Sequence, residues 1–162
     1  YSQWDGLSAE QVVSLWRDDE RSVLVGTRSL MTGVDAKGRT CSLVTIDRVP
    51  RAAGNPVDDA RVEAYMEALQ IDKWAADRMV YASDAALLLE QAAGRLIRAV
   101  SDFGLVAILD PRFLKTGPVT YKEQTRAVYK AAVKRFLHVT TKMTEAEAFL
   151  DANARAHLAL AA

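Results

Sequence analysis

Residues 91–112 read QAAGRLIRAVSDFGLVAILDPR, and they join a predicted helix to a predicted strand. The helix is expected over Asp84–Val100, with Ser83 as its N-cap and a glycine stop signal shortly after its end. Residues 104–109 (GLVAIL) then form an apolar run without polar alternation, closed by an Asp-Pro pair. Such a run is typical of a central strand in a parallel sheet that is covered on both faces.

Working outward, two further apolar runs at 21–26 and 42–46 predict strands of the same kind. Helices are predicted over four more segments: 7–16, 57–70, 121–137 and 145–158. Alternating strands and helices favour the α/β class, and no linker divides the chain, so one domain is expected over residues 1–162. The residues from 139 to 162 are expected to include a peripheral C-terminal helix.

Two helix starts carry capping signals. Ser8 is followed three residues later by Gln11, which predicts a capping box at the first helix. Asn55 before Pro56 predicts an N-cap for the helix over 57–70. Three strands are few for a doubly wound sheet, so a first strand is expected upstream of Tyr1.

The composition is that of an ordinary globular domain. The 162 residues include 21 Lys and Arg against 21 Asp and Glu, so the formal net charge of zero gives no general attraction to nucleic acid or to an anionic membrane. Cys41 is the one cysteine, which excludes an internal disulfide and fits a cytoplasmic protein. No apolar run approaches the roughly 18 residues of a membrane span. A start at Tyr1 instead of methionine suggests a piece of a longer protein.

The first segment with possible chemistry is 25–38, VGTRSLMTGVDAKG. It follows the end of a predicted strand, which is where ligands bind in open α/β sheets. Gly26 allows close approach of a phosphate, and Thr27, Arg28 and Ser29 supply donors to it. Asp35 lies between two glycines and could be held as an acceptor. Taken alone, the segment is read more readily as a glycine-rich turn between two strands.

The second segment is 91–102, QAAGRLIRAVSD. On a helix, Gln91, Arg95 and Arg98 have the spacing i, i+4 and i+7 and share one face. Two arginines held rigidly on one face suit a transferring phosphoryl group, whose charge is spread over several oxygens. A solvated face paired with acidic neighbours is the plainer alternative.

In this order, GTRSxxxGVDxxG (26–38), QxxGRxIRxxxDxG (91–104) and LDxR (109–112) resemble motifs V and VI of the DinG/XPD branch of superfamily-two ATP-dependent DNA helicases. The resemblance runs from about Leu15 to about Phe136. It implies the second, C-terminal RecA-like lobe, a three-layer α/β/α fold with a central, mainly parallel sheet. ATP and Mg²⁺ would then be held mainly by an N-terminal RecA-like lobe, and no metal site is expected in this chain.

The resemblance also implies roles for particular residues. Arg95 and Arg98 would be arginine fingers toward ATP, and Gln91 would help to position them or the attacking water. Residues near the nucleotide would be Gly33, Asp35 and Gly94. The contacts to single-stranded DNA would come from Gly26, Thr27, Arg28 and Ser29.

Some features depart from the family. Leu30 and Thr32 stand where the family usually has an aromatic residue and an acid. The chain has no GxxxxGK[ST] phosphate loop, so it is predicted to be inactive in ATP hydrolysis without the N-terminal lobe. A non-catalytic nucleic-acid-binding or interaction domain with a decayed motor fold is the alternative, and an unrelated α/β domain with chance motifs is a third. Trp4, Trp16 and Trp74 could stack on bases, although packing is their more ordinary role.

Overall fold

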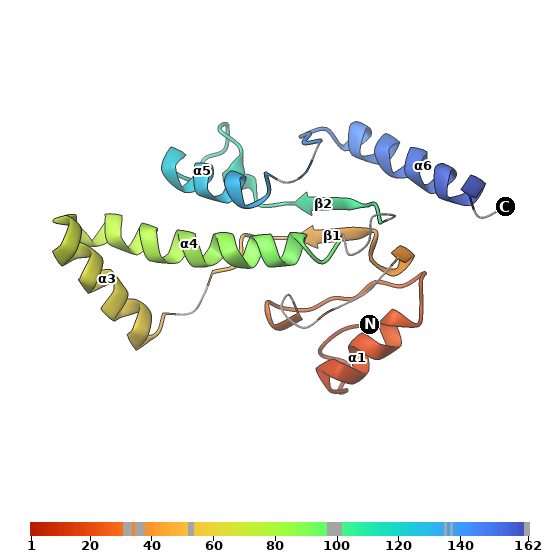
Figure 1. Ribbon diagram of the computed structural model, residues 1–162, viewed down its shortest axis with the longest axis horizontal. Helices are drawn as coiled ribbons and strands as arrows, with labels where there is room; N and C mark the ends of the chain where they lie inside the picture. Colours follow the sequence, from red (N-terminus) through yellow and green to blue (C-terminus); the bar gives the residue numbers. More distant parts are fainter. Residues whose placement is uncertain are drawn as a thin grey trace. The chain divides into compact units, whose positions relative to one another are not determined.

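A computed structural model describes residues 1–30, 34, 38–51, 54–96, 102–134, 136 and 138–160 (Figure 1). The elements follow one another in the order α1 (Ala9–Arg17), η1 (Gly38–Cys41), β1 (Leu43–Ile46), α3 (Pro56–Leu69), α4 (Lys73–Ala93), β2 (Leu105–Ile108), η2 (Pro111–Phe113), α5 (Glu123–Ala132) and α6 (Met143–Leu160). They belong to two compact units, each assembled from segments that are separate in the sequence. The first unit comprises Tyr1–Thr45, Ala92–Ala107 and Phe136–Ala162, and the second comprises Ile46–Gln91 and Ile108–Arg135.

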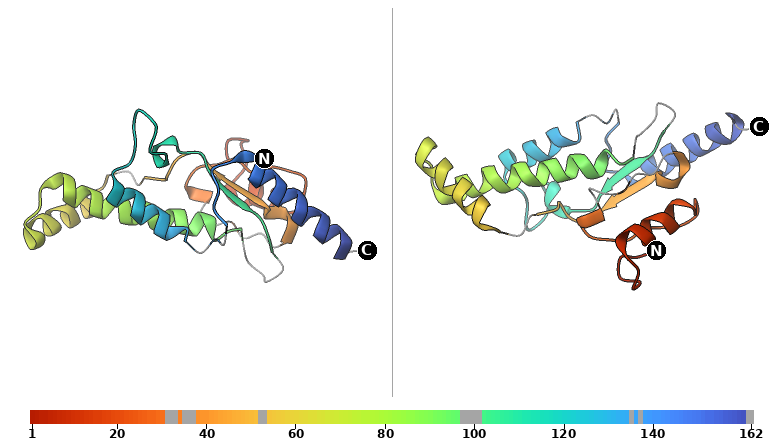
Figure 2. Two further views of the ribbon diagram at one scale, coloured as in Figure 1. Left: turned by 90° about the horizontal axis from the view of Figure 1, so that it is seen from above. Right: turned by 60° about the horizontal axis from the view of Figure 1, so that its bottom comes forward.

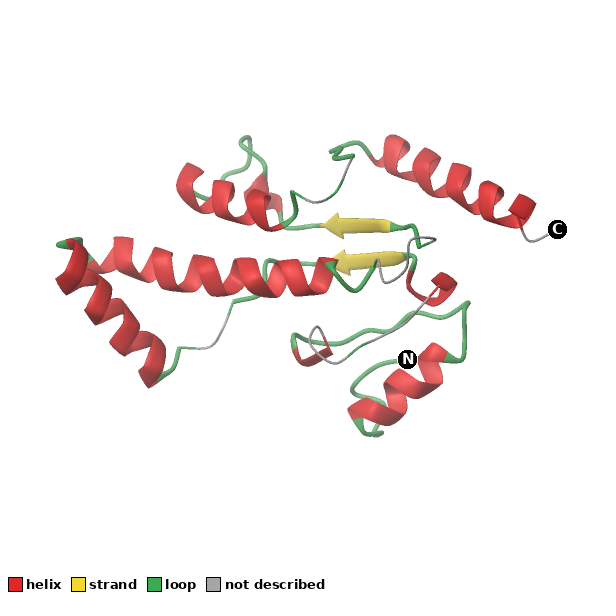
Figure 3. Cartoon of the chain, viewed as in Figure 1, coloured by secondary structure: helices red, strands yellow, loops and turns green. Residues whose placement is uncertain are grey.

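The sheet consists of β1 and β2 within the described residues. The two strands point in the same direction (Figure 1, Figure 3) and lie side by side in the other views (Figure 2). Backbone hydrogen bonds run from Leu105 N to Ser42 O at 3.0 Å and from Leu109 N to Ile46 O at 2.9 Å. The constant offset between the bonded residues is the register of a parallel pair. The predicted strands at 42–46 and 104–109 are therefore confirmed, and with them the α/β class.

The third predicted strand, at 21–26, is wrong as a buried sheet strand. Its backbone instead pairs with the N-terminus through one parallel bridge between Ser2 and Val25. Val25 N donates to Tyr1 O at 2.9 Å, and the terminal amino group of Tyr1 donates to Val23 O at 2.8 Å. Val23 is 71% exposed and Val25 is 51% exposed, so the apolar run does not lie in a sheet interior. The apolar run predicted its extended backbone correctly. Its pairing partner is Ser2, however, which lies in a segment with no strand signal.

The two capping predictions are confirmed. Ser8 accepts from the backbone N–H of Gln11, while the Gln11 side chain accepts from the Ser8 N–H, so both halves of the capping box form. Asn55 accepts from the N–H groups of Val57 and Asp58 at the start of α3. These bonds satisfy backbone donors that have no partner within the helix.

Helix α4 begins well before its predicted start at residue 84. Asp72 caps it, because the Asp72 carboxylate accepts from Ala75 N at 2.8 Å. Ser83 is consequently inside the helix, where its hydroxyl donates to Met79 O at 2.7 Å. The prediction of Ser83 as an N-cap was wrong because serine can bond to the preceding turn of a helix as well as cap one.

Helix α4 ends at Ala93. The N–H groups of Arg95 and Leu96 donate three residues back, to Ala92 and Ala93, at 3.2 and 3.3 Å. These shorter-range bonds tighten the chain into a turn, and they occur at Gly94, whose helix propensity is low. Arg95 therefore lies in a turn after α4, and the predicted single helical face shared by Gln91 and Arg95 is wrong.

The last two helices differ from the predictions mainly in length. Helix α5 is shorter than the predicted 121–137, because it ends at Ala132 with Val133 as its C-cap. Helix α6 extends past the predicted 145–158 at both ends. Among the described residues, no helix has the length and apolar content needed to cross a membrane.

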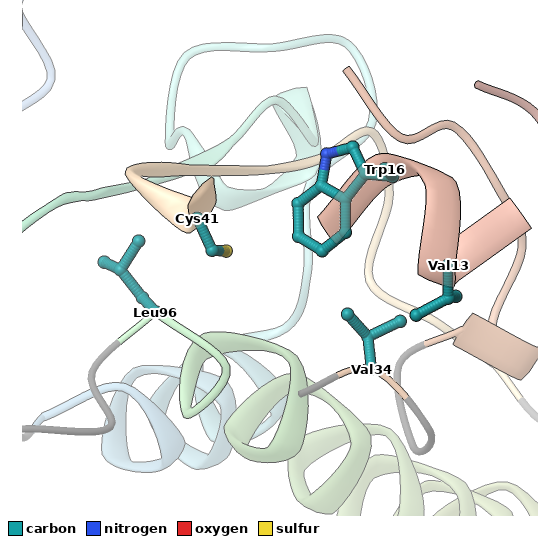
Figure 4. Packing of buried hydrophobic residues seen from close by; sticks show 5 residues of the cluster. All are labelled: Val13, Trp16, Val34, Cys41 and Leu96. Atoms are coloured by element: carbon teal, nitrogen blue, oxygen red, sulfur yellow. The ribbon is translucent and has the colours of Figure 1, made fainter. Parts of the chain in front are cut away.

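Each unit has its own buried cluster. The cluster of the first unit joins α1, the segment around Val34 and the turn after α4 (Figure 4), through Val13, Trp16, Val34, Cys41 and Leu96. In the second unit, Val62 of α3 packs with Ala76 and Val80 of α4. These two helices are joined by a short turn, where Gln70 adopts the left-handed conformation.

Any side chain at Gly104, directly before β2, is expected to destabilise the fold. A Cβ atom added there would lie 2.4 Å from Ser42 O and 2.6 Å from Leu96 Cδ1. The backbone oxygen cannot move without breaking the pairing of β1 with β2. Gly104→Ala should therefore lower the free energy of unfolding by about 1–3 kcal/mol, measured by urea denaturation.

Gly117→Ala is the matched control, because the nearest atom to its added Cβ is 3.6 Å away. Equal stability of the two variants would show that β1 and β2 do not approach as closely as described.

Candidate nucleotide and nucleic-acid interface

Residues Gly26–Ser29 are exposed and follow Val25 in the first unit, with helical backbone beginning at Ser29. Gly26 fits closely there, since an added Cβ would lie 2.1 Å from Leu30 Cδ1 and 2.9 Å from Gln3 Oε1. The hydroxyls of Thr27 and Ser29 are within hydrogen-bond distance of each other at 3.2 Å. Hydroxyl and backbone donors are thus gathered in one accessible turn.

Gln3 holds this loop, and no sequence motif pointed to it. Its side-chain oxygen accepts from Thr27 N at 2.7 Å and from Thr27 Oγ1 at 3.2 Å. Its backbone N–H donates to Val25 O at 3.1 Å. Arg28, by contrast, is exposed and forms no salt bridge with the described residues. Only the pairing of the N-terminus with Val23–Val25 brings Gln3 to the loop, so local sequence signals could not have found it.

Arg95 links the two predicted motifs. Its Nη1 donates to the backbone oxygen of Val34 at 3.1 Å, across 61 positions of sequence. Val34 lies between Gly33 and Asp35, the two residues of the first motif that were predicted to lie near the nucleotide. The half-buried guanidinium is thereby held against the backbone of the first motif.

The packing beneath this bond involves the same neighbours. Leu96, directly after Arg95, is 2% exposed and shares its buried cluster with Val34 and Trp16 (Figure 4). Leu30, which departs from the family pattern, also packs against this cluster. At the position where the family usually has an aromatic residue, Leu30 therefore makes an apolar contact with the buried cluster of the first unit.

The remaining predicted site residues are placed as follows. Gln91 is in the last turn of α4, and its side-chain oxygen is buried without a hydrogen-bond partner among the described residues. Gly94 lies in the turn after α4. Gly33, Asp35 and Arg98 lie outside the described residues, so their predicted positions remain predictions.

In the second unit, the LDxR segment builds a buried network around Asp110. The Asp110 side chain accepts from Arg112 Nη2 at 2.6 Å, Arg112 Nε at 2.8 Å and Tyr121 Oη at 2.7 Å. It also accepts from the backbone N–H of Val49 at 3.1 Å. One carboxylate thus ties together the loop after β1, the residues after β2 and the start of α5.

Hydrogen bonding sets the charge state of this carboxylate. Burial by itself would raise the pKa of Asp110, but the donors from Arg112, Tyr121 and Val49 outweigh burial and hold that pKa well below its usual range. Burial and the bond to Asp110 raise the pKa of Tyr121, which therefore remains a protonated donor. The Arg112 guanidinium also lies over the Tyr121 ring, 4.7 Å from its centroid. Tyr121 and Val49 were not singled out by the sequence analysis.

No group of three or more His, Cys, Asp or Glu side chains among the described residues is arranged to hold a metal ion. The polar groups that the structure places at the predicted site are the Arg95 guanidinium, the Thr27 and Ser29 hydroxyls and the Gln3 and Gln91 amides. Such donors suit phosphate oxygens better than they suit a cation.

The parallel β1–β2 pair, its helices and the linked first and second motifs define an α/β domain of the RecA-like helicase class. A profile described as Helicase C-terminal domain matches residues 2–130. The chain belongs to this family of helicase C-terminal domains, and it is DinG-like within it.

Individual relatives agree with this assignment. The ATP-dependent helicase DinG of Mycobacterium tuberculosis (strain ATCC 25177 / H37Ra) is 36% identical over 144 residues, which cover 83% of this chain and 21% of the relative. The ATP-dependent DNA helicase YoaA of Escherichia coli (strain K12) is 38% identical over 93 residues, 57% of this chain and 14% of the relative. The 3'-5' exonuclease DinG of Bacillus subtilis (strain 168) is 28% identical over 113 residues, 69% of this chain and 12% of the relative. The chain thus matches about a fifth or less of the length of these relatives.

Asp110 is expected to make stability depend on pH in the acid range. Its folded-state pKa is lowered, so its contribution is complete above the unfolded-state pKa of about 4 and is lost as the pH falls below that value. Asp110→Asn should lower the free energy of unfolding at pH 7 by about 2–3 kcal/mol, because charged donors lose their partner. The difference from the wild type should shrink on acidification to pH 3.

Urea denaturation at several pH values measures both effects. Asp47→Asn is the control, because the Asp47 side chain is 88% exposed and forms one long ion pair. If Asp110→Asn keeps a constant stability difference from pH 7 to pH 3, the charge of Asp110 does not stabilise the fold.

Proposed function

We propose that this chain is the C-terminal motor lobe of an ATP-dependent DNA helicase. In this role it completes an ATP site whose phosphate-binding loop belongs to an N-terminal RecA-like lobe. The observation that carries the proposal is the bond from Arg95 to the Val34 carbonyl, which connects the two motifs on which the resemblance rests. The similarity to ATP-dependent helicases called DinG and YoaA supports the same function.

Arg95 and Arg98 are proposed as the residues that stabilise the charge of the transferring phosphoryl group. A guanidinium can do this only if its position is fixed before the reaction, because reorganisation would consume the stabilisation. The contact of Arg95 with Val34 and the burial of Leu96 supply such fixation for one of them. Arg98 is proposed on the motif alone.

Gln91 is proposed to orient the attacking water or the arginines. Its buried side-chain oxygen has no hydrogen-bond partner among the described residues, and buried polar atoms usually have one. The attacking water or an arginine side chain would supply the N–H or O–H donor that this oxygen lacks. Gly33, Asp35 and Gly94 are proposed to lie near the nucleotide, and Mg²⁺ is proposed to be held mainly by the N-terminal lobe.

Single-stranded DNA is proposed to contact the loop Gly26–Ser29. The support is that this segment is exposed and presents Arg28 free of salt bridges to described residues. Contacts of this kind bind the sugar-phosphate backbone and do not read sequence. The loop would hold the strand while the nucleotide site changes state.

The proposal predicts that Arg95→Ala and Arg98→Ala each lower ATP hydrolysis stimulated by single-stranded DNA by at least about 100-fold. The measurement is steady-state ATPase activity in a longer protein that carries this lobe and an N-terminal lobe. DNA binding without ATP should be retained. The 162-residue chain alone should hydrolyse no ATP.

Arg17→Ala is the control, because Arg17 is exposed at the end of α1 and belongs to neither motif. Normal turnover in both the Arg95 and Arg98 variants would rule out arginine fingers. No turnover in any longer protein, together with intact DNA binding, would favour the alternative of a binding domain with a decayed motor fold.

A further inference from the structure

A pocket of about 370 Å³ lies within the second unit and contains none of the motif V or motif VI residues. It is built from the loop after β1, the start of α5 and one face of α4. The α4 residues have the spacing of a single helical face: Trp74, Asp77, Arg78, Tyr81 and Ala82. Its volume suits a small ligand or one unit of a polymer.

The charge of the pocket is strongly positive, although the whole chain is neutral. Arg51, Arg78, Arg112 and Lys122 line it, with Asp77 as the one acidic lining residue; because Asp110 neutralises Arg112, three positive charges face one negative charge. Arg112 is already bonded to the buried carboxylate of the LDxR segment. Arg78 and Lys122 form no salt bridge with any described residue. They are therefore available for an anion.

The start of α5 adds donors at the same place. Lys122 is the N-cap residue, and its ammonium group cannot accept from the first N–H groups of α5, so Lys122 leaves them uncapped. Thr120 and Thr125 contribute hydroxyls to the lining. The carboxylate of Glu123, in the first turn of α5, is turned to Arg126 at 2.8 Å and is not part of the lining. The arrangement favours a phosphate.

Aromatic rings form the rest of the lining. Trp74 is 78% exposed, which is unusual for the largest apolar side chain, whereas Trp16 is buried in the cluster of the first unit. Arg51 lies over the ring of Tyr81, 4.9 Å from its centroid. Nucleobases stack on aromatic rings and on guanidinium planes of this kind.

We propose that this pocket binds one nucleotide unit, with its phosphate between Arg78 and Lys122 and its base against Trp74 and Tyr81. The inference rests on the proposed function, because a lobe that binds single-stranded DNA meets such units in succession. A free nucleotide offers the same chemistry and is the other possible source. The pocket would then add a second contact to nucleic acid, outside both helicase motifs.

The test is fluorescence anisotropy of labelled oligo(dT) with the 162-residue chain, repeated over a series of salt concentrations. Trp74→Ala should weaken binding by about ten-fold, and Trp74→Phe should keep most of the affinity. The double variant Arg78→Ala, Lys122→Ala should reduce the slope of log affinity against log salt by about 0.7, because the one phosphate placed between the two side chains contributes about 0.7. Photocrosslinking with an oligonucleotide containing 5-iodouracil should label Trp74 or Tyr81.

Two matched controls accompany these variants. Lys73→Ala removes the same charge from the same helix at a position outside the lining, and Tyr65→Ala removes an exposed ring from α3. Both should bind oligo(dT) as the wild type does. Wild-type affinity and salt slope in all pocket variants would overturn the proposal.

Two further experiments distinguish failure of the pocket proposal from failure of the proposed function. If dTMP at millimolar concentration binds in a Trp74-dependent way while oligo(dT) does not bind, the pocket is a free-nucleotide site and the strand reading is wrong. Arg28→Ala tests the loop of the first unit: loss of oligo(dT) binding in that variant alone keeps the proposed function and removes the pocket. Loss in the pocket variants, with normal binding in Arg28→Ala, supports the pocket and rules out Gly26–Ser29 as a contact to the strand.

Discussion

The first unit depends on one constraint, which is that the turn after α4 must stay packed against Val34. Leu96 is buried in the same cluster as Val34, and Arg95 donates to the Val34 carbonyl. An apolar contact and a directional bond at adjacent residues fix both distance and orientation. Gly104 allows this packing to coexist with the sheet, because a side chain there would collide with Leu96 and with the backbone of Ser42.

In the second unit, the carboxylate of Asp110 holds separate segments of the chain together. Asp110 accepts from a loop, an arginine and a tyrosine hydroxyl, so three segments that follow or precede secondary structure meet at one buried charge. The buried charge of Asp110 is stable because both carboxylate oxygens accept hydrogen bonds, and these bonds offset the cost of burial. The same network orients Arg112 and Tyr121 toward the basic, aromatic pocket. Arg112 and Tyr121 therefore stabilise the fold through Asp110 and also line the pocket proposed to bind a nucleotide unit.

Local signals predicted local structure well. The capping box of Ser8 and Gln11 and the cap at Asn55 formed as expected, because each needs only residues within one turn. The strands at 42–46 and 104–109 were also correct. Predictions failed where a competing partner was distant or ambiguous: Val23–Val25 paired with the N-terminus, and Asp72 rather than Ser83 began α4. The sequence identified the motif residues, but their spacing could not show that the Arg95 side chain donates to the backbone oxygen of Val34.

The sequence by itself determined the class of the chain, since the order and spacing of three motifs and the apolar runs between them need no coordinates. It also determined the starts of α1 and α3, because their caps are local. Tertiary structure alone decided that Gln3 supports the loop after Val25, that Asp110 gathers three segments, and that Trp74, Arg78 and Lys122 line one pocket. Gln3 and Thr27, Val49 and Asp110, and the α4 face and Lys122 are far apart in sequence, so only the packing of strands and helices brings their side chains within reach of one another.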